Sequence, residues 1–273
     1  MIAPAVIILG LLTFWPMALS FVWSFTKYTG LGDPQWVGFQ NYLDLLGDPL
    51  FHQAALNTAF FAVTTMAVGP ALGLATAILL NRKMRGRAFY RAAFFLPVTT
   101  ALVAVAAVWK LLLNDGGIVN QALGLFGITG HQWLADPNTA LPAIAIASIW
   151  QGFGFEMVVF LAALQGLPPD LLEAASIDGA GPFRRFWHVV LPYLRPTFVF
   201  VYVIGLIGAF QVFDQVYVMT QGGPINSTLT VVYYLINRFR ALDLGQASAI
   251  AYLLVAVLAG LSYLQVRLAR KWS

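Results

Sequence analysis

Six separate segments of this sequence are apolar over 18 to 25 residues each, and this feature constrains the fold most. A helix needs about 20 mostly apolar residues to cross the roughly 30 Å hydrocarbon core of a bilayer. The segments lack the alternating pattern of a transmembrane β-strand, so helices are the remaining structure that can span the membrane. The six expected spans are residues 2–25, 58–80, 92–113, 140–164, 197–219 and 249–266.

The composition excludes most classes of soluble protein. Of the 273 residues, 60% are hydrophobic and 10% are charged, whereas soluble domains average roughly 45–50% and about 25%. A water-soluble globule could not bury so much apolar surface. We therefore expect an all-α polytopic membrane protein, a bundle of six transmembrane helices in a single domain over residues 1–273, with lipid as its main solvent and no nucleic-acid partner.

The first apolar segment is expected to stay in the protein as a membrane helix. No basic residue precedes Lys27, and the apolar run is longer than the 7–15 residues typical of a signal peptide. The polar and aromatic segment that follows, residues 28–57, is expected to form an amphipathic helix at the membrane interface.

The positions of lysine and arginine predict the orientation, because cytoplasmic loops carry an excess of both. Six spans place eleven of the 15 cations on one side, which we take as the cytoplasm, and both termini then lie there as well. Those eleven are Arg82, Lys83, Arg85, Arg87, Arg91, Arg184, Arg185, Arg195, Arg267, Arg270 and Lys271. On the opposite side, Lys110 is interpreted as a snorkelling anchor. Arg238 and Arg240 on that side either meet an acidic partner or anionic solute or are solvated.

The longest cytoplasmic connection, residues 165–196, is organised like a structural element. Asp170 and Glu173 have the spacing of a capping box, which predicts a short helix from Leu171 to Asp178 that ends at Gly179. A second helix is expected over residues 183–190, ended by Pro192.

The short helix has two possible roles. Its small residues would let another surface approach the backbone closely, and its leucine and isoleucine side chains could anchor in a groove of a partner. The alternative is a helical hairpin that packs beneath the bundle. The candidate docking residues are Leu171, Leu172, Glu173, Ala174, Ala175, Ser176, Ile177, Asp178 and Gly179.

The same loop resembles a known signature. Glu173-Ala174-Ala175, then Gly179, Val189 and Leu191-Pro192 have the spacing found in permease subunits of bacterial binding-protein-dependent ABC importers, although the family usually has Ile at the position of Val189. The segments Gly38–Tyr42 and Phe213–Pro224 are similar to the carbohydrate-uptake branch, the maltose and glycerol-phosphate type. The resemblance covers nearly the whole chain.

This resemblance implies a division of labour between subunits. The segment from Leu171 to Gly179 would be a coupling helix seated in a groove of a cytoplasmic ATPase. The implied partners are a second homologous permease, two copies of the ATPase and an extracytoplasmic solute-binding protein. ATP and Mg would bind to the ATPase, and this chain would bind no cofactor.

Residues that could perform catalysis do not form a recognisable pattern. None of the four lysines follows a glycine, so the sequence has no Gly-Lys-Ser/Thr phosphate loop. His52, His131 and His188 lack metal-ligand spacing, and cysteine is absent. The chain is therefore expected to be a transport subunit rather than an enzyme, with no metal site.

Polar residues inside the expected spans are candidates for a translocation path, because such residues are costly in a membrane. Amides and carboxylates beside aromatic rings suit a polyhydroxylated solute. The alternative is a polar clamp between helices. Residues 211, 214 and 215 are expected to share one helix face, and Gly69 and Gly73 are expected to mark close helix packing. The path candidates are Gln151, Glu156, Gln211, Asp214, Gln215 and Tyr217.

The sequence thus predicts the permease of an ATP-driven importer of a sugar or related polyol, working by alternating access. Within the same family, a glycerol-3-phosphate or glycerophosphodiester importer is the alternative. Two alternatives belong to other functional classes: an ion-coupled secondary transporter that uses Glu156 and Asp214, and a channel or structural membrane subunit.

Overall fold

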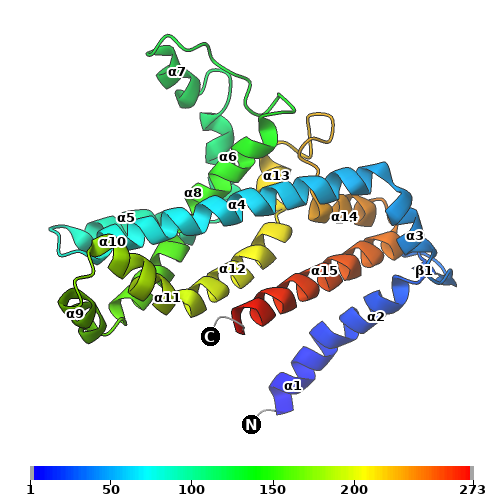
Figure 1. Cartoon of the computed structure of the whole chain (residues 1–273). Coiled ribbons are helices and arrows are strands. Elements are labelled where there is room, and N and C mark those ends of the chain that lie inside the picture. The colour runs from blue at the N-terminus through cyan, green and yellow to red at the C-terminus, as the bar shows by residue number, and fades with distance from the viewer. Residues whose placement is uncertain (1–2, 271–273) are drawn as a thin grey trace.

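The computed structural model describes residues 3–270, and nearly all of their regular secondary structure is helical (Figure 1). The elements up to residue 124 are α1 (Ala3–Leu9), the π-helix η1 (Gly10–Phe14), α2 (Trp15–Trp23), strands β1 (Thr26–Lys27) and β2 (Gln35–Trp36), α3 (Gln40–Gly47), α4 (Pro49–Asn81), α5 (Arg87–Thr99), α6 (Leu102–Leu112) and α7 (Ile118–Gly124). The later elements are α8 (Ala140–Gln165), α9 (Pro169–Ile177), α10 (Pro182–Arg185), the π-helix η2 (Phe186–Val190), α11 (Leu191–Tyr193), α12 (Arg195–Phe210), α13 (Asp214–Met219), α14 (Val231–Arg240) and α15 (Leu244–Arg270).

Within the described residues, five helical segments are long and apolar enough to cross a membrane, and a bent pair of helices adds a sixth if it counts as one span. The five are Ala5–Trp23, Pro49–Asn81, Ala140–Gln165, Arg195–Met219 and Leu244–Leu268. The expected all-α membrane fold is confirmed. Two of the six expected segments differ in form, and α4 begins nine residues before the expected start at residue 58. Ile2 and Lys271 lie outside the described residues.

The third expected span, residues 92–113, is not one straight helix. It consists of the end of α5 and the whole of α6, which meet at an angle of 99°. Pro97 restricts the chain just before the bend, and the Thr99 and Thr100 hydroxyl groups donate to the Leu96 carbonyl oxygen at 2.9 and 3.2 Å. These short polar side chains satisfy backbone groups that a broken helix leaves free.

The fifth expected span, residues 197–219, is interrupted. α12 ends at Phe210, α13 begins at Asp214, and residues 211–213 are not helical. The expectation that Gln211 shares one continuous helix face with Asp214 and Gln215 is therefore wrong. No proline or glycine lies within residues 211–213 to signal the break, which is held by tertiary contacts described below.

The core is built around the crossing of α4 and α8. A Cβ atom added to Gly73 of α4 would lie 2.7 Å from the Cβ of Glu156 in α8, so this approach requires glycine. The expected close packing at Gly69 and Gly73 is confirmed. One buried cluster includes Phe61 and Ile144, and a second one includes Met157 and Phe160.

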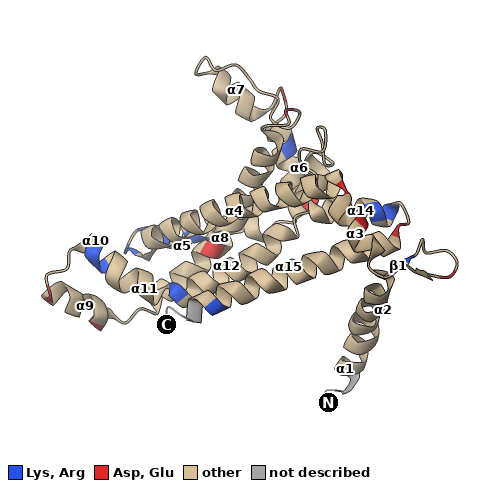
Figure 2. Cartoon of the chain, turned by 45° about the vertical axis from the view of Figure 1, so that its right-hand side comes forward, with Lys and Arg blue, Asp and Glu red and all other residues tan. Residues whose placement is uncertain are grey.

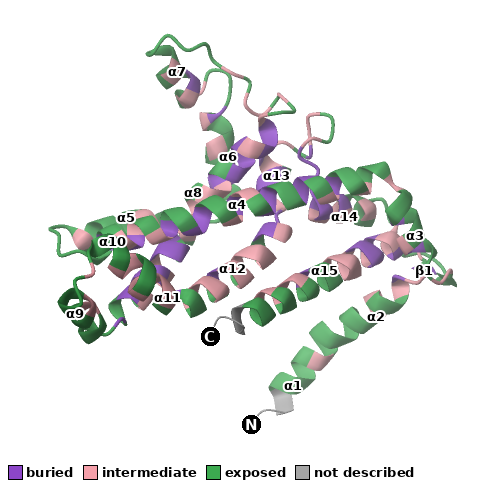
Figure 3. Cartoon of the chain, viewed as in Figure 1, coloured by how far each residue is buried: buried purple, intermediate pink, exposed green. Residues whose placement is uncertain are grey.

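The first helical segment stands apart from this core. None of the described residues of α2 is buried, and Figure 3 shows α1 and α2 as exposed along most of their length. Packing against α15 holds α2, where the Tyr252 hydroxyl donates to the Met17 carbonyl oxygen at 2.5 Å. The exposed apolar side chains of this segment include Leu11, Leu12, Phe14 and Trp15.

Charged residues gather near the two ends of the long helices. Figure 2 shows lysine and arginine at α10, at the start of α5 and near the end of α15, with a separate group at α14. This placement agrees with two polar ends separated by an apolar middle.

Candidate functional site

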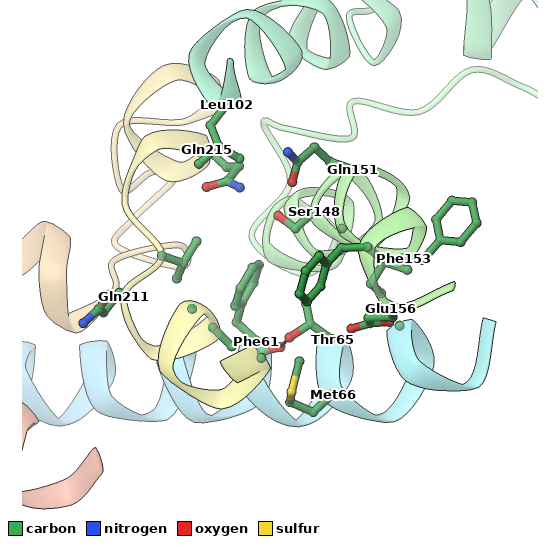
Figure 4. Close-up of a pocket in the computed structure, with 18 of the residues that line it drawn as sticks. Phe61, Thr65, Met66, Leu102, Ser148, Gln151, Phe153, Glu156, Gln211 and Gln215 are labelled. Atoms are coloured by element: carbon green, nitrogen blue, oxygen red, sulfur yellow. Dashed lines mark hydrogen bonds between the residues drawn. The ribbon is translucent and has the colours of Figure 1, made fainter. Parts of the chain in front are cut away.

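A cavity of about 350 Å³ lies between the middle parts of four helical segments (Figure 4). α4 and the bend between α5 and α6 form part of its wall, and α8 and the interrupted α12–α13 segment form the rest. The cavity therefore sits where both broken spans meet the two most tightly packed helices. Its lining includes the aromatic residues Phe61, Phe153, Phe155 and Phe213.

Five of the six predicted path residues line this cavity. They are Gln151, Glu156, Gln211, Asp214 and Gln215. In Figure 4, Gln151 and Gln215 face the same space, whereas the Gln211 side chain points to one side. Polar residues that the sequence predicted in two distant segments therefore line the same cavity.

Glu156 is the most enclosed acidic side chain of the cavity, with 8% of its surface exposed. A Cβ atom added to Gly69 would lie 2.9 Å from Glu156 Oε2, so glycine leaves the room that this carboxyl group occupies. Glu156 Oε2 is buried and has no hydrogen-bond partner among the described residues. A polar atom in this state favours a ligand or water that can hydrogen-bond to it.

Gln151 connects the cavity to the bend of the third span. Its Nε2 atom lies 3.5 Å from the Pro97 carbonyl oxygen, a long hydrogen bond. The amide oxygen of Gln151 remains available on the cavity side. Gln151 can therefore support the bend with its amide nitrogen and contact a solute with its amide oxygen at the same time.

At the break between α12 and α13, a free backbone carbonyl group finds its hydrogen-bond partner in another part of the chain. The buried Thr230 hydroxyl donates to the Val212 carbonyl oxygen at 3.1 Å. Residues just before α14 are tied in turn to α4, because Asn57 Nδ2 donates to the Leu229 carbonyl oxygen at 2.8 Å and the Val231 N–H donates to Thr58 Oγ1 at 2.9 Å. These bonds fix the irregular backbone beside the cavity.

Tyr217, the sixth predicted residue, does not line the cavity. Its ring stacks on Phe213 with centroids 5.4 Å apart, and the Arg240 guanidinium lies 5.1 Å from its ring centroid. Phe213 itself lines the cavity, so the Tyr217 ring lies behind a ring of the cavity wall.

Sequence reasoning missed two hydroxyl groups of the site. Thr65 of α4 and Ser148 of α8 line the cavity and donate to carbonyl oxygens of their own helices, at 2.8 Å to Phe61 and 2.9 Å to Ile144. Their oxygens can still accept hydrogen bonds. Single hydroxyl residues are common in membrane helices, and the only available signal was that Ser148 lies three residues before Gln151.

The segment expected to dock with an ATPase forms a projecting helix, α9 (Figure 1). Pro168 precedes it without a side-chain cap, so the predicted capping box of Asp170 and Glu173 is wrong. Pro169 starts the helix instead, since proline suits the first helical position. Gly179 ends it with φ +75°, and the Ala180 N–H donates to the Ala175 carbonyl oxygen at 2.9 Å.

α9 has no buried residue, and Ile177 is 87% exposed. In the described part of the chain, it packs mainly on α10 and η2, where Arg185 Nη1 donates to Ser176 Oγ at 2.8 Å. The second helix of this loop was expected to end before Pro192, but it continues through α11 to Tyr193. α9 and this second helix therefore form a helical hairpin, on which α9 exposes apolar side chains such as Ile177.

Besides Arg240, two more cations at the opposite end are engaged within the chain. Arg238 Nη2 lies 2.9 Å from Asp48 Oδ2, and the Tyr234 hydroxyl bonds to both groups. Burial raises the pKa of Asp48, but hydrogen bonds from Tyr234, Leu50 N–H and Arg238 together hold it below its ordinary value of 3.8. The ammonium group of Lys110, the residue interpreted as a snorkelling anchor, donates from Nζ to the Val218 carbonyl oxygen at 3.0 Å.

A metal site has no support in the geometry. Among residues 3–270, no group of three or more histidine and acidic side chains is placed to hold a metal ion.

Comparison with known proteins identifies relatives over the whole chain. The family model described as "Binding-protein-dependent transport system inner membrane component" matches residues 69–272. The lactose transport system permease protein LacF of Rhizobium radiobacter is 37% identical over 278 residues, which cover 99% of this chain and 93% of LacF. The sn-glycerol-3-phosphate transport system permease protein UgpA of Pectobacterium atrosepticum is 31% identical over 271 residues, covering 98% and 92%.

The fold is shared with a solved transporter. A chain of the bacterial alginate ABC transporter, crystallised in complex with an alginate pentasaccharide-bound periplasmic protein, superposes with a TM-score of 0.88. The two chains are 22% identical, and the match covers 99% of this chain and 93% of the other.

Proposed function

This chain belongs to the family of binding-protein-dependent transport system inner membrane components, and on that premise we propose that a sugar or related polyol crosses the membrane through the cavity between α4, α8, α12 and α13. The chain is the membrane-spanning permease subunit of a carbohydrate-type ABC importer. The observation that carries the proposed path is the gathering of amide, carboxyl and hydroxyl groups with aromatic rings around one cavity.

The chemistry of the lining suits a polyhydroxylated solute. Gln151 and Gln215 offer amide groups that both donate and accept, and Thr65 and Ser148 offer hydroxyl oxygens. Phenylalanine rings can pack on the apolar faces of a sugar ring. Few polar groups in a mainly apolar pocket are the usual arrangement for binding a small molecule.

α9 is proposed to be the coupling helix that docks in a groove of a cytoplasmic ATPase. Its exposed residues Leu171 and Ile177 would be the apolar anchors, and Ala174 lets the partner approach the backbone. The loop that carries α9 leads through α11 directly into α12, which lines the cavity. Movement of the ATPase at α9 would thus reach the solute path through a short helical connection.

The proposed assembly contains a second homologous permease, two ATPase copies and an extracytoplasmic binding protein. ATP and Mg would bind to the ATPase. The alginate transporter, which has the same fold, was crystallised with a periplasmic protein, and the family description names binding-protein-dependent transport. Both features support a binding-protein partner here.

The protein is proposed to lie in the bacterial cytoplasmic membrane with both termini in the cytoplasm. In that orientation, α9 and the cation-rich start of α5 face the cytoplasm, which follows the excess of lysine and arginine on that side. The Asp48–Arg238 pair then lies on the extracytoplasmic side.

Reconstitution tests this function. The importer, purified with the subunits that co-purify with this chain and supplied with its binding protein, is placed in vesicles with labelled lactose outside and ATP at the ATPase side. We expect uptake that requires ATP and does not respond to an imposed proton or sodium gradient. Gradient-driven uptake without ATP would support an ion-coupled transporter, and downhill flux alone would support a channel.

A pair of variants tests the path. Asp214→Ala should change the KM or the rate of solute uptake, because Asp214 lines the cavity. The matched control is Asp33→Ala, which removes an exposed acidic side chain outside the cavity. Equal uptake kinetics in wild type and Asp214→Ala would remove this residue from the proposed path.

A further inference from the structure

The cavity lining carries acidic groups without any basic group. Among the cavity-lining residues in the described part of the chain, Glu156 and Asp214 are acidic, and no lysine, arginine or histidine is present. The remaining polar groups are neutral amides and hydroxyls. The wall therefore contains nothing that could neutralise a negatively charged solute.

The position of Glu156 is fixed by the packing of α4 against α8. Gly69 and Gly73 leave space for its side chain, which is more than nine-tenths buried, and its Oε2 atom lacks a hydrogen-bond partner among residues 3–270. A flexible exposed acid could swing away from an approaching anion. Glu156 cannot, because the helix crossing surrounds it.

Three cations at the end of the long helices opposite α9 already contact other groups. Arg238 pairs with Asp48, Lys110 donates to a carbonyl oxygen of α13, and Arg240 lies over Tyr217. None of the three lines the cavity. Lys27, the fourth cation expected at this end, does not line the cavity either, so no cation of this end lies in the cavity wall.

From these observations we infer that the cavity selects uncharged polyhydroxylated solutes and rejects phosphorylated or carboxylated ones, with Glu156 and Asp214 as the residues that determine this choice. The inference rests on the proposed function and narrows its substrate class. An anion placed here would lose its hydration without gaining a cation, and such burial is costly. A sugar hydroxyl, in contrast, can donate to the free Glu156 oxygen and satisfy it.

The relatives leave this choice open, because their names include both lactose and sn-glycerol 3-phosphate. The charge of the cavity lining therefore indicates that this chain transports neutral sugars. It also removes the glycerol-phosphate alternative that the family resemblance allows.

The test uses the complete reconstituted importer with its binding protein and four labelled probes. Lactose and trehalose are neutral, and trehalose 6-phosphate and sn-glycerol 3-phosphate are anionic. Trehalose and its phosphate form a matched pair that differs by one charged group. We expect ATP-driven uptake of at least one neutral probe, and a kcat/KM for trehalose 6-phosphate at least about tenfold below that for trehalose, since an unpaired anion costs more than one factor of ten.

Charge-removing variants show whether the permease cavity causes the discrimination. Glu156→Gln and Asp214→Asn keep the size of each side chain, and the same binding protein serves every variant. The ratio of anionic to neutral uptake should rise at least about threefold in each variant and stay unchanged in Asp33→Asn. A ratio unaffected by both cavity variants would overturn the assignment of these residues.

The outcomes separate the inference from the proposed function. ATP-driven uptake of an anionic probe, equal to or faster than that of the neutral probes, overturns the inference and leaves the importer function standing. ATP-independent uptake of every transported probe overturns both. Neutral uptake with rejected anions, together with a ratio that shifts in the cavity variants, supports both.

Discussion

Arg238 Nη2 and Asp48 Oδ2 lie 2.9 Å apart, across 190 positions of the sequence. Asp48 also caps α4, since its Oδ1 accepts from the Leu50 N–H at 2.8 Å. One carboxylate thus starts the longest helix and attaches it to α14. α14 in turn follows the segment that holds the break beside the cavity.

The Asp48 carboxylate makes the stability of the folded protein depend on pH. The pKa of Asp48 is below its ordinary value in the folded protein, so its contribution is present above about pH 4 and is lost as the pH falls through the folded pKa. We expect the difference in Tm between wild type and Asp48→Asn to be constant from pH 7 to 5 and to shrink below about pH 4. Thermal unfolding of the purified importer measures it, and Asp33→Asn should show no such difference at any pH.

Gly73→Ala should separate α4 from α8. The added Cβ would come within 2.7 Å of the Glu156 Cβ and 3.0 Å of the Met157 backbone nitrogen, neither of which can move freely. Overpacking of this kind costs about 1–3 kcal/mol. Gly260→Ala in α15, where nothing lies within 4 Å, is the matched control. Equal thermal stability of the two variants would contradict the tight crossing.

Thr230→Val removes a buried hydrogen bond while keeping the side-chain shape. The Val212 carbonyl oxygen would lose its partner, at a cost of about 1–3 kcal/mol. Thr76→Val is the control, because the Thr76 hydroxyl bonds only within its own helix. We expect a lower Tm and faster amide hydrogen exchange at residues 211–213 in Thr230→Val alone. Unchanged exchange there would show that the break is held by other contacts.

Gly179→Val should disturb the end of α9 without disturbing insertion. Gly179 has φ +75°, where a β-branched residue is strained by about 1–2 kcal/mol, whereas Gly181 has φ −67°. We expect ATP hydrolysis to continue while solute uptake falls in Gly179→Val, and both to persist in Gly181→Val. Normal uptake in both variants would argue against a coupling role for this helix.

The number and approximate position of the long apolar helices could be predicted from the sequence, because a bilayer imposes length and composition on them. The start of α4 could not, since residues 49–57 are partly polar and lie beyond the apolar stretch. Their helical state depends on the Asp48 cap and on the bonds of Asn57 to a segment about 170 positions away.

The two breaks show where sequence reasoning stops. Pro97 gives a local signal for the bend after Thr99, but proline also occurs inside the continuous helix α4, at Pro70. The break at 211–213 carries no such signal and depends on Thr230. The polar residues of the cavity were nevertheless found, because polarity within an apolar segment is visible without knowing whether the helix continues.

The exposed segment from α1 to α2 has a practical consequence for anyone handling the isolated subunit. Apart from the packing of α2 on α15, this segment buries little surface on the rest of the polypeptide. Its position therefore depends strongly on the annular lipid or neighbouring subunit that surrounds it. Detergent extraction that strips this shell should release the segment first and leave the remaining helices with an intact interior.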